Sequence, residues 1–339
     1  MEHSQYHNES NYQYIADMAT GFQNSQLLWT AIEFEIFTHI HNGTNTVATI
    51  ATATNTDARA IERLLNALVA LKLLNKKQEY YSNTQSATQY LVKTSKHYSG
   101  SLLHNSYLWD SWKTLPDVIK TGRCLANTPF HKKNKDFIKN YLSSYDIDII
   151  VDKERLLNVI PLRNANSILK IGATGYQLSL EIAKKHPDIK IHILDYPEVI
   201  DVLSDILASE QQIENISFIK CNDMMDTLDN TNNYDIVFAD YLLDVYSYKD
   251  SMRLLTNLYS NIANSGKLIF CMPIINDTRT FPEAATMNAI TLLLNTENGD
   301  SYTFSDMWVL LKEAGFKDVE FTEVNDNLHI VLANKSYLG

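Results

Sequence analysis

The stretch Ser167-Ile-Leu-Lys-Ile-Gly-Ala-Thr-Gly-Tyr176, which continues through a helical pattern to His192-Ile-Leu-Asp-Tyr-Pro197, decides the fold of this chain. It predicts an apolar strand, a glycine-bearing turn, an amphipathic helix and a second strand that ends in an acid. Gly172 and Gly175 allow the backbone to approach a ligand closely, and Asp195, about twenty residues beyond the turn, is placed to accept hydrogen bonds from ribose hydroxyls. The turn alone is weak support, since many strand-to-helix turns need glycine; together with the acid it predicts an adenosine cofactor.

Composition limits the classes of partner. The 339 residues suffice for about two domains with a substantial core. Lys plus Arg number 29 against 40 Asp plus Glu, and the resulting net charge of -11 disfavours nucleic acid and anionic membranes as partners. Cys124, Cys221 and Cys271 show no Cys-x-x-Cys spacing and the first ten residues do not resemble a signal peptide, so a cytoplasmic location is expected. No metal is expected either, because the ten histidines do not combine with carboxylates at ligand spacing.

The first hundred residues show helical periodicity and one short hairpin pattern. Residues 12–41 have the spacing of helices with wide apolar faces. A short helix over 47–53, a turn, a longer helix over 58–71 and a Lys/Gln-rich turn before Tyr80-Tyr81 predict a winged helix. Winged helices often bind DNA, but the acidic balance of the chain disfavours that role here.

The remainder divides into aromatic-rich helices and an alternating region. Residues 98–165 are predicted to be helical, and their aromatic side chains suit either a core or a flat apolar ligand pocket. From about residue 166 strand and helix patterns alternate, which predicts a mostly parallel, doubly wound sheet. A helical insert over about 282–295 and a closing hairpin that ends near residue 333 complete the pattern.

Several segments together carry a family resemblance. They are Leu64-Leu-Asn-Ala-Leu-Val-Ala-Leu-Lys-Leu-Leu74, Tyr81-Ser-Asn-Thr84, Trp112-Lys-Thr-Leu-Pro116, the glycine turn, Asp195-Tyr-Pro197, Asn222-Asp-Met224 and Ala314-Gly-Phe316. In this order they resemble the small-molecule O-methyltransferases that use S-adenosylmethionine and carry an N-terminal winged-helix dimerisation domain. The resemblance covers nearly the whole chain. It implies a homodimer and three regions: a winged-helix dimerisation domain (1–100), a helical linker that lines the substrate (101–165) and a Rossmann-like S-adenosylmethionine-binding domain of α/β class (166–339).

The resemblance also assigns the cofactor site. It implies that Gly172 and Gly175 face the methionine part of S-adenosylmethionine and that Asp195 holds its ribose. The pair Asp223-Met224 would bracket the adenine, although Asp223 equally suits a residue that caps a turn. Two further cofactor-binding residues are expected beside these: Tyr196 and Asp240.

This sequence departs from the family at three chemically important positions. The acid expected two residues before the first glycine is Lys170, which would repel the amino group of the cofactor unless it turns away. The family's catalytic histidine aligns with Asp244, within Leu243-Asp-Val-Tyr-Ser247. The acid that orients this histidine aligns with Ser301, and the adjacent Asp300 would replace it only if the loop shifts by one residue.

Other residues are candidates through their place on helices that border the family's substrate. His104 is a candidate for a base displaced to another helix. For the remaining candidates contact with substrate and simple packing are both open: Tyr107, Trp112, Phe137, Tyr141, Met287 and Asn288.

Three functions follow from these residues. The first is a methyltransferase for a small, aromatic or polyketide-like metabolite, with Asp244 as base or orienting group and the methylated atom (O, C or N) open. An unperturbed Asp is a weaker base than His by about 2.6 pKa units, and burial would recover part of this difference. The second is a non-methylating catalyst on the same scaffold, such as a pericyclase, hydroxylase or decarboxylase. The third is a catalytically silent dimer that binds a ligand.

Overall fold

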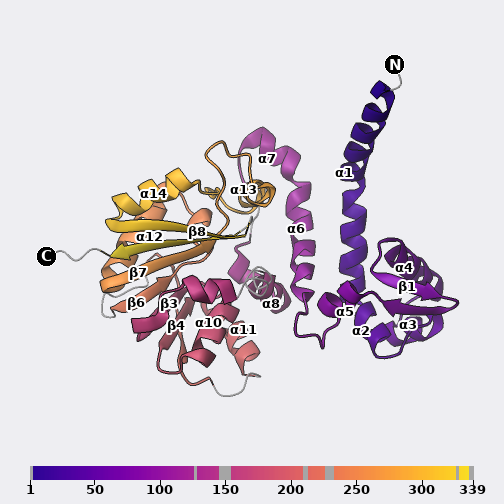
Figure 1. Cartoon of the computed structure of the whole chain (residues 1–339), viewed down its shortest axis with the longest axis horizontal. Helices are drawn as coiled ribbons and strands as arrows, with labels where there is room; N and C mark the ends of the chain where they lie inside the picture. The colour runs from indigo at the N-terminus through magenta and orange to yellow at the C-terminus, as the bar shows by residue number, and fades with distance from the viewer. Residues whose placement is uncertain are drawn as a thin grey trace. The chain divides into compact units, whose positions relative to one another are not determined.

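The computed structural model describes residues 3–125, 128–144, 154–208, 213–225, 233–325 and 328–335, without the side chains of residues 3–11 and 144. The chain forms two compact units, Met1–Ser106 and Tyr107–Gly339 (Figure 1). None of the helices in the described ranges is both long enough and apolar enough to cross a membrane.

The first unit is a winged helix preceded by a long helix. Its elements are α1 (His3–Glu33), α2 (Ile36–His41), α3 (Val47–Thr54), α4 (Ala58–Ala70), β1 (Leu74–Lys77), β2 (Tyr80–Asn83), α5 (Gln85–Leu91) and the 3-10 turn η1 (Gly100–Leu103). The Asp57 side chain caps α4 by accepting a hydrogen bond from the Ala60 amide at 2.9 Å. Ile61, Leu65 and Leu68 form the buried stripe of α4, and the antiparallel pair β1–β2 forms the wing. The helix–turn–helix and hairpin predicted from the sequence are therefore confirmed.

The second unit contains the α/β domain. After α6 (His104–Lys113), which crosses the unit boundary, its elements are α7 (Leu115–Thr121), η2 (Phe130–Lys132), α8 (Lys135–Ser144), a helix over 154–159, η3 (Leu162–Asn164), β3 (Ser167–Ile171), α10 (Tyr176–Lys185), β4 (Lys190–Asp195), α11 (Pro197–Leu207), β5 (Ile216–Lys220), β6 (Tyr234–Phe238), η4 (Leu243–Val245), α12 (Tyr248–Asn261), β7 (Ile262–Met272), α13 (Glu283–Asn295), α14 (Phe304–Glu313), β8 (Phe316–Asn325) and β9 (Leu328–Lys335).

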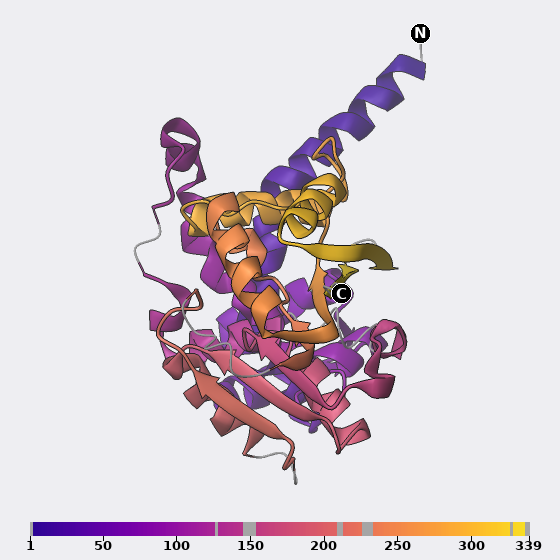
Figure 2. The same cartoon turned by 90° about the vertical axis from the view of Figure 1, so that its left-hand side faces the viewer.

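The seven strands lie in the order β5-β4-β3-β6-β7-β9-β8. The strands from β5 to β7 are parallel, and β9 runs antiparallel between β7 and β8 (Figures 1 and 2). The chain moves outward from β3 to β4 and β5 and then returns to the other side of β3 as β6. Strand order thus reverses between β3 and β6, and ligands of open α/β sheets bind outside the carboxyl ends of the strands at such a reversal.

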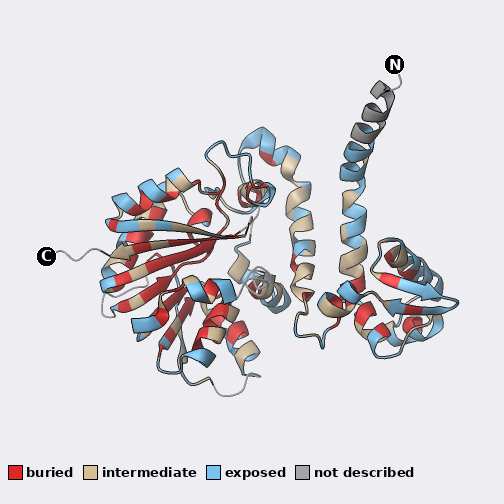
Figure 3. Cartoon of the chain, in the orientation of Figure 1, coloured by how far each residue is buried: buried red, intermediate tan, exposed pale blue. Residues whose placement is uncertain are grey.

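Both faces of the inner strands, such as β3 and β6, are buried, and Figure 3 shows these strands mostly in red. Alternate strand residues such as Ile168 and Ile191 pack with α8, α10 and α11, whereas their neighbours, such as Leu169, pack with α12 and α14. Strands buried on two faces read as continuous apolar runs, which is the pattern seen in the sequence. The predicted Rossmann-like architecture is therefore confirmed.

One glycine of β7 has no room for a side chain. A Cβ on Gly266 would lie 2.6 Å from Ile262 Cγ2, 2.9 Å from the Ala263 carbonyl oxygen and 3.0 Å from the Tyr234 carbonyl oxygen. The pairing of β6 with β7 shifts register next to this residue. Two of the three close atoms belong to the backbone, so relief requires the strand itself to move.

Gly266→Ala is therefore expected to lower the free energy of unfolding by about 1–3 kcal/mol, the usual range for overpacking. Gly21→Ala in α1 is the control, because nothing lies within 4 Å of its added Cβ and alanine favours helix. Urea unfolding followed by circular dichroism compares the two. Equal stabilities of wild type and Gly266→Ala would show that the irregular segment of β7 absorbs the methyl group.

Candidate functional site

The candidate site is the carboxyl edge of the sheet around β3. Gly172 follows β3, Asp195 ends β4, Asp223 and Met224 follow β5, and Asp240 follows β6. The structure thus brings together the cofactor-binding residues expected from the sequence, because parallel strands end at the same edge.

The glycine turn leaves space above its backbone. Gly172 has φ +77° and Gly175, the N-cap of α10, has φ +67°. A Cβ on Gly172 would meet only the Thr174 hydroxyl oxygen, at 3.8 Å. The turn is held to the neighbouring strand because the Gly172 amide donates to the Leu194 carbonyl at 2.9 Å. A ligand can therefore approach the backbone closely here.

Asp195 is buried and fixed by backbone donors. Its two carboxylate oxygens accept hydrogen bonds from the Ala173 and Tyr196 amides, both at 2.7 Å. Burial raises the pKa of Asp195 to about 6, while these two hydrogen bonds and the charge of Lys170 act in the opposite direction. Each oxygen keeps a second lone pair, which is the acceptor capacity that a ribose diol requires.

Two tyrosines meet beside the Asp223-Met224 loop. The Met224 amide hydrogen-bonds Tyr196, whose pKa is raised to about 12, chiefly by burial. Burial also raises the pKa of Tyr246, and Tyr196, Asp223 and Asp195 add to the effect, so the Tyr246 hydroxyl lies in the same cluster. Tyr246 is a candidate site residue that sequence reasoning missed, although it lies only two positions after Asp244.

The loop itself is tightly organised. Asp223 is exposed, and its carboxylate accepts a hydrogen bond from the Met225 amide at 2.9 Å, which is the turn-capping role left open by the sequence. Met224 is buried with its sulfur 3.6 Å from the Cys221 thiol. The turn thus holds a polar and a soft apolar side chain in consecutive positions.

The Lys170 ammonium is buried and donates to a carbonyl of the glycine turn. The side chain is 1% exposed, and its ammonium lies 2.9 Å from the Gly172 carbonyl oxygen and 3.3 Å from an Asp240 carboxylate oxygen. The other Asp240 oxygen accepts a hydrogen bond from the Cys271 amide at 2.9 Å. Asp240 is therefore a partner of Lys170 in the structure, and its expected contact with the cofactor stays a prediction.

Asp244 lies in η4 and is fully buried. Burial raises its pKa from the ordinary 3.8 to about 6, and a hydrogen bond from its own amide opposes this. Its Oδ1 atom has no hydrogen-bond partner within the described part of the chain. A buried acceptor without a partner is costly, so a ligand hydroxyl that donates to it would gain free energy.

In the loop that aligns with the orienting acid, Ser301 and Asp300 have other partners. The Ser301 hydroxyl donates to the Ala285 carbonyl of α13 at 3.0 Å. The Asp300 amide donates to the Asp244 carbonyl at 3.0 Å, but the Asp300 carboxylate pairs with Arg279 at 2.9 Å. Asp300 therefore does not take over the role of the missing acid, and the loop shift that this would need is not seen.

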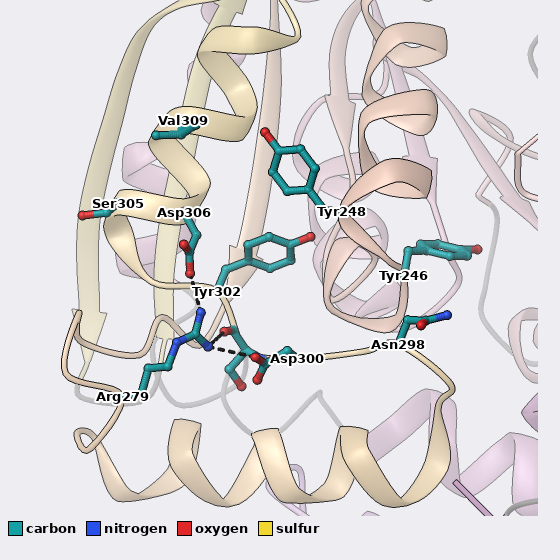
Figure 4. A pocket seen from close by; sticks show the side chains of 10 residues that line it. Tyr246, Tyr248, Arg279, Asn298, Asp300, Tyr302, Ser305, Asp306 and Val309 are labelled. Carbon is teal, nitrogen blue, oxygen red and sulfur yellow. Dashed lines mark hydrogen bonds and ion pairs between the residues drawn. The ribbon is translucent and has the colours of Figure 1, made fainter. Parts of the chain in front are cut away.

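Arg279 centres a pocket of about 320 Å³ at this loop (Figure 4). Its guanidinium pairs with the carboxylates of Asp300 and Asp306 and also donates to the Ser301 carbonyl at 3.0 Å. The lining residues are Tyr246, Tyr248, Arg279, Asn298, Asp300, Ser301, Tyr302, Ser305, Asp306 and Val309. Tyr246 thus borders both this pocket and the cluster around Tyr196.

Aromatic side chains connect the expected substrate helices with the cofactor residues. Phe137 packs edge-on against Tyr107 and stacks with Tyr141, with centroids 5.2 and 6.3 Å apart. Phe130 lies 5.0 Å from the Tyr141 ring, and His131 stacks on Tyr196 at 3.8 Å. The structure therefore places Tyr107, Phe137 and Tyr141 in one aromatic row, which ends at Tyr196.

The other candidates lie outside this row. Trp112 is half-buried on α6, while Met287 is exposed and Asn288 half-buried on α13. His104 belongs to the first unit, and burial lowers its pKa to about 4. A histidine with so low a pKa is a weaker base than an ordinary imidazole.

Comparison with known proteins identifies the family. The O-methyltransferase dimerisation domain matches residues 16–93, and the O-methyltransferase domain matches residues 112–317. The chain belongs to the O-methyltransferase family. Members of this family use S-adenosylmethionine as methyl donor. The family resemblance stated from the sequence is therefore confirmed, and the dimerisation domain indicates a homodimer.

Individual O-methyltransferases are similar over nearly their whole length. Acetylserotonin O-methyltransferase of Gallus gallus is 23% identical and matches 95% of this chain and 97% of its own. The tetracenomycin polyketide synthesis 8-O-methyl transferase TcmO of Streptomyces glaucescens is 20% identical, with 92% and 93% covered. The crystal structure of human N-acetylserotonin methyltransferase in complex with S-adenosylmethionine superposes with a TM-score of 0.86 at 23% identity, over 96% of this chain and 98% of that one. This last likeness establishes the fold.

The residues present fit the nucleoside part of S-adenosylmethionine. Asp195 has lone pairs left for a ribose, and the nearby Tyr196, Met224 and Tyr246 are partly apolar side chains of the kind that suits an adenine. At the tail end the turn around Gly172 is open, but its carbonyl already accepts a hydrogen bond from Lys170.

The raised pKa of Asp244 makes a prediction for stability. The native chain keeps this proton up to about pH 6, whereas the unfolded chain releases it near pH 3.8, so stability falls as pH rises through this window. Asp244→Asn removes the buried charge and is expected to raise the free energy of unfolding at pH 8 by about 1–3 kcal/mol, with a smaller effect at pH 4.5. Urea titrations at the two pH values measure this.

Asp195→Asn is the matched comparison. Asp195 has a similarly raised pKa, but both its oxygens accept backbone hydrogen bonds. In Asp195→Asn the side-chain NH2 group replaces one of these oxygens, so one of the two hydrogen bonds is lost. It should gain less than Asp244→Asn at pH 8. Parallel pH–stability curves for wild type and Asp244→Asn would contradict the assigned pKa.

Proposed function

We propose that this chain transfers a methyl group from S-adenosylmethionine to a small, aromatic or polyketide-like metabolite, with Asp244 as the group that accepts the proton of the nucleophile. The observation that carries this proposal is the buried Asp244 carboxyl, with a pKa of about 6 and an Oδ1 atom that lacks a partner in the described structure. It stands where the family has a histidine.

The cofactor's chemistry defines what the protein must add. S-adenosylmethionine, when bound, supplies an electrophilic methyl group on a sulfonium, so the protein mainly positions the nucleophile and removes its proton. Asp195 would bind the ribose, and Tyr196, Met224 and Tyr246 would enclose the adenine.

Burial gives Asp244 a basicity close to that of histidine. Its pKa of about 6 lies near the ordinary 6.5 of an imidazole and well above the 3.8 of an exposed carboxyl. At pH 7 the Asp244 carboxyl is largely ionised and can accept a proton from the nucleophile. The protonated carboxyl is acidic enough to release that proton again. Asp244 thereby replaces most of the driving force that the loss of histidine would remove.

The aromatic row supports the substrate class. Tyr107, Phe137 and Tyr141 lie on α6 and α8 and lead to Tyr196, which adjoins Asp195. Aromatic walls bind flat apolar molecules through their ring faces. The related TcmO acts, by its name, in tetracenomycin polyketide synthesis, which agrees with this class.

A second function has support from one observation. Neither the family's histidine nor its orienting acid is present, and the Ser301 hydroxyl is bound to α13 instead. A non-methylating catalyst that retains the scaffold would lose both groups together. A ligand-binding dimer without catalysis is the third candidate.

Calorimetry on the purified, verified ligand-free protein provides the first test. Micromolar binding of S-adenosylmethionine and S-adenosylhomocysteine is expected, and Asp195→Asn should weaken both by about ten-fold or more, since it removes hydrogen bonds to the ribose. Asp188→Asn, at an exposed position before β4, should leave both affinities unchanged. Absence of binding by wild type would contradict the proposed cofactor.

Mass spectrometry with trideuteromethyl-labelled cofactor and a panel of phenols, aromatic hydroxy acids and aromatic amines tests the reaction. Label is expected in the product, and Asp244→Asn should lower kcat by about 100-fold or more, the usual contribution of a general base. Below about pH 6 the wild-type rate should fall as Asp244 becomes protonated. Converted substrate without label would favour the non-methylating catalyst.

A further inference from the structure

Lys170 is a buried cation at the centre of the candidate site. It lies within β3 between Leu169 and Ile171. The residues that face it are Ile193 of β4 and Phe238 of β6, so its neighbours on all sides within the sheet are apolar. Removing an ammonium from water is costly unless it is paired and fully hydrogen-bonded. Its surroundings therefore reveal what the fold uses it for.

The ammonium has two hydrogen-bond acceptors and one ion-pair partner. They are the Gly172 carbonyl at 2.9 Å, an Asp240 carboxylate oxygen at 3.3 Å and the Ile171 carbonyl at 3.4 Å. Asp240 is held in turn by the Cys271 amide. The pair consequently joins the ends of β3, β6 and β7, and the Asp240 oxygen that faces Lys170 accepts no hydrogen bond within the described part of the chain.

The shortest of these contacts faces the glycine turn. The Gly172 carbonyl belongs to the turn above which a ligand has space, and Lys170 takes one of its two lone pairs. A ligand cation on the second lone pair would stand roughly 5 Å from the Lys170 ammonium, given ordinary hydrogen-bond lengths. Like charges this close repel strongly in a site of low dielectric constant.

The partner Asp240 does not hide this charge from the site. Lys170 still lowers the pKa of Asp195, the residue placed to bind a ribose. An arriving ligand would therefore meet the charge of Lys170 at the turn, beside the carboxylates of Asp240 and Asp195.

We propose that Lys170 makes the glycine turn select ligands by the charge of their tail: it occupies the Gly172 carbonyl and disfavours a ligand ammonium there. This inference rests on the proposed function, because it concerns the tail of an adenosine-based cofactor. The amino group of S-adenosylmethionine would then contribute little to its affinity, and recognition would depend on the nucleoside and on the tail carboxylate.

The test compares two ligands on two proteins by calorimetry. The ligands are S-adenosylhomocysteine and its analogue that carries hydrogen in place of the amino group. The variant is Lys170→Met/Asp240→Asn, which removes both charges, leaves no unpaired ion and keeps an oxygen for the Cys271 amide. Lys190→Met, at the exposed start of β4, is the matched control.

Wild type and Lys190→Met should bind the two ligands with similar affinity, or the analogue more tightly. In the double variant the freed Gly172 carbonyl accepts the ligand ammonium, so S-adenosylhomocysteine should bind about ten-fold more tightly than the analogue. An unchanged affinity ratio in the double variant would overturn the inference.

Wild type alone also decides the matter if the variant does not fold. A roughly ten-fold preference of wild type for S-adenosylhomocysteine over the analogue would show that the amino group is recognised in the presence of Lys170, and would overturn the inference. Failure of folded wild type and variant to bind either ligand would instead overturn the proposed function, and this inference with it.

Discussion

Burial of the parallel sheet on both faces is the constraint from which the rest of the second unit follows. Helices α8, α10 and α11 cover one face, and α12 and α14 cover the other, so the strand interiors must be apolar. Buried carboxylates then lie where the strands end. Asp195 and Asp240 occupy such positions, and together with the turn at Gly172 they form the edge where the chain can bind a polar ligand.

Lys170 is the exception that tests this constraint. It lies inside a strand and on the face that packs against α10 and α11, where an unpaired ammonium would be strongly destabilising. Asp240 removes the difficulty because it leaves β6, the adjacent strand, at the same level of the sheet. The site thus contains a charge that belongs to the fold, and any ligand must be compatible with it.

Much of the fold could be predicted from the sequence because it depends on local periodicity. The strand at Ser167–Ile171 and the helix α4 were placed correctly from apolar spacing. The start of β7 could not be placed in this way, because Ile262 pairs with Tyr234 ahead of a register shift. Pairing of this kind is set by a neighbouring strand far away in the sequence, so no local pattern signals it.

The sequence predicts that the candidate site's residues gather at one edge of the sheet, but it does not predict their electrostatics. Asp195 and the Asp223-Met224 pair could be found from spacing and resemblance. The Lys170–Asp240 contact could not, since the two residues are seventy positions apart and meet only through the strand order. The pKa of Asp244 likewise depends on burial by distant segments, including the loop whose Asp300 amide donates to the Asp244 carbonyl.

If Asp244 takes the place of the family's histidine, as the resemblance implies, no orienting acid is needed at position 301. An imidazole must be held in one tautomer and one ring orientation, and a second acid commonly does this. A carboxylate has two equivalent oxygens and no tautomer, so Asp244 needs no such partner. An acid at position 301 would add a second negative charge near a buried carboxyl and raise its pKa further, toward a group that stays protonated at neutral pH. Asp244 and Ser301 are therefore consistent with each other: the neutral serine leaves Asp244 with a pKa of about 6, low enough for the group to ionise and accept a proton at pH 7.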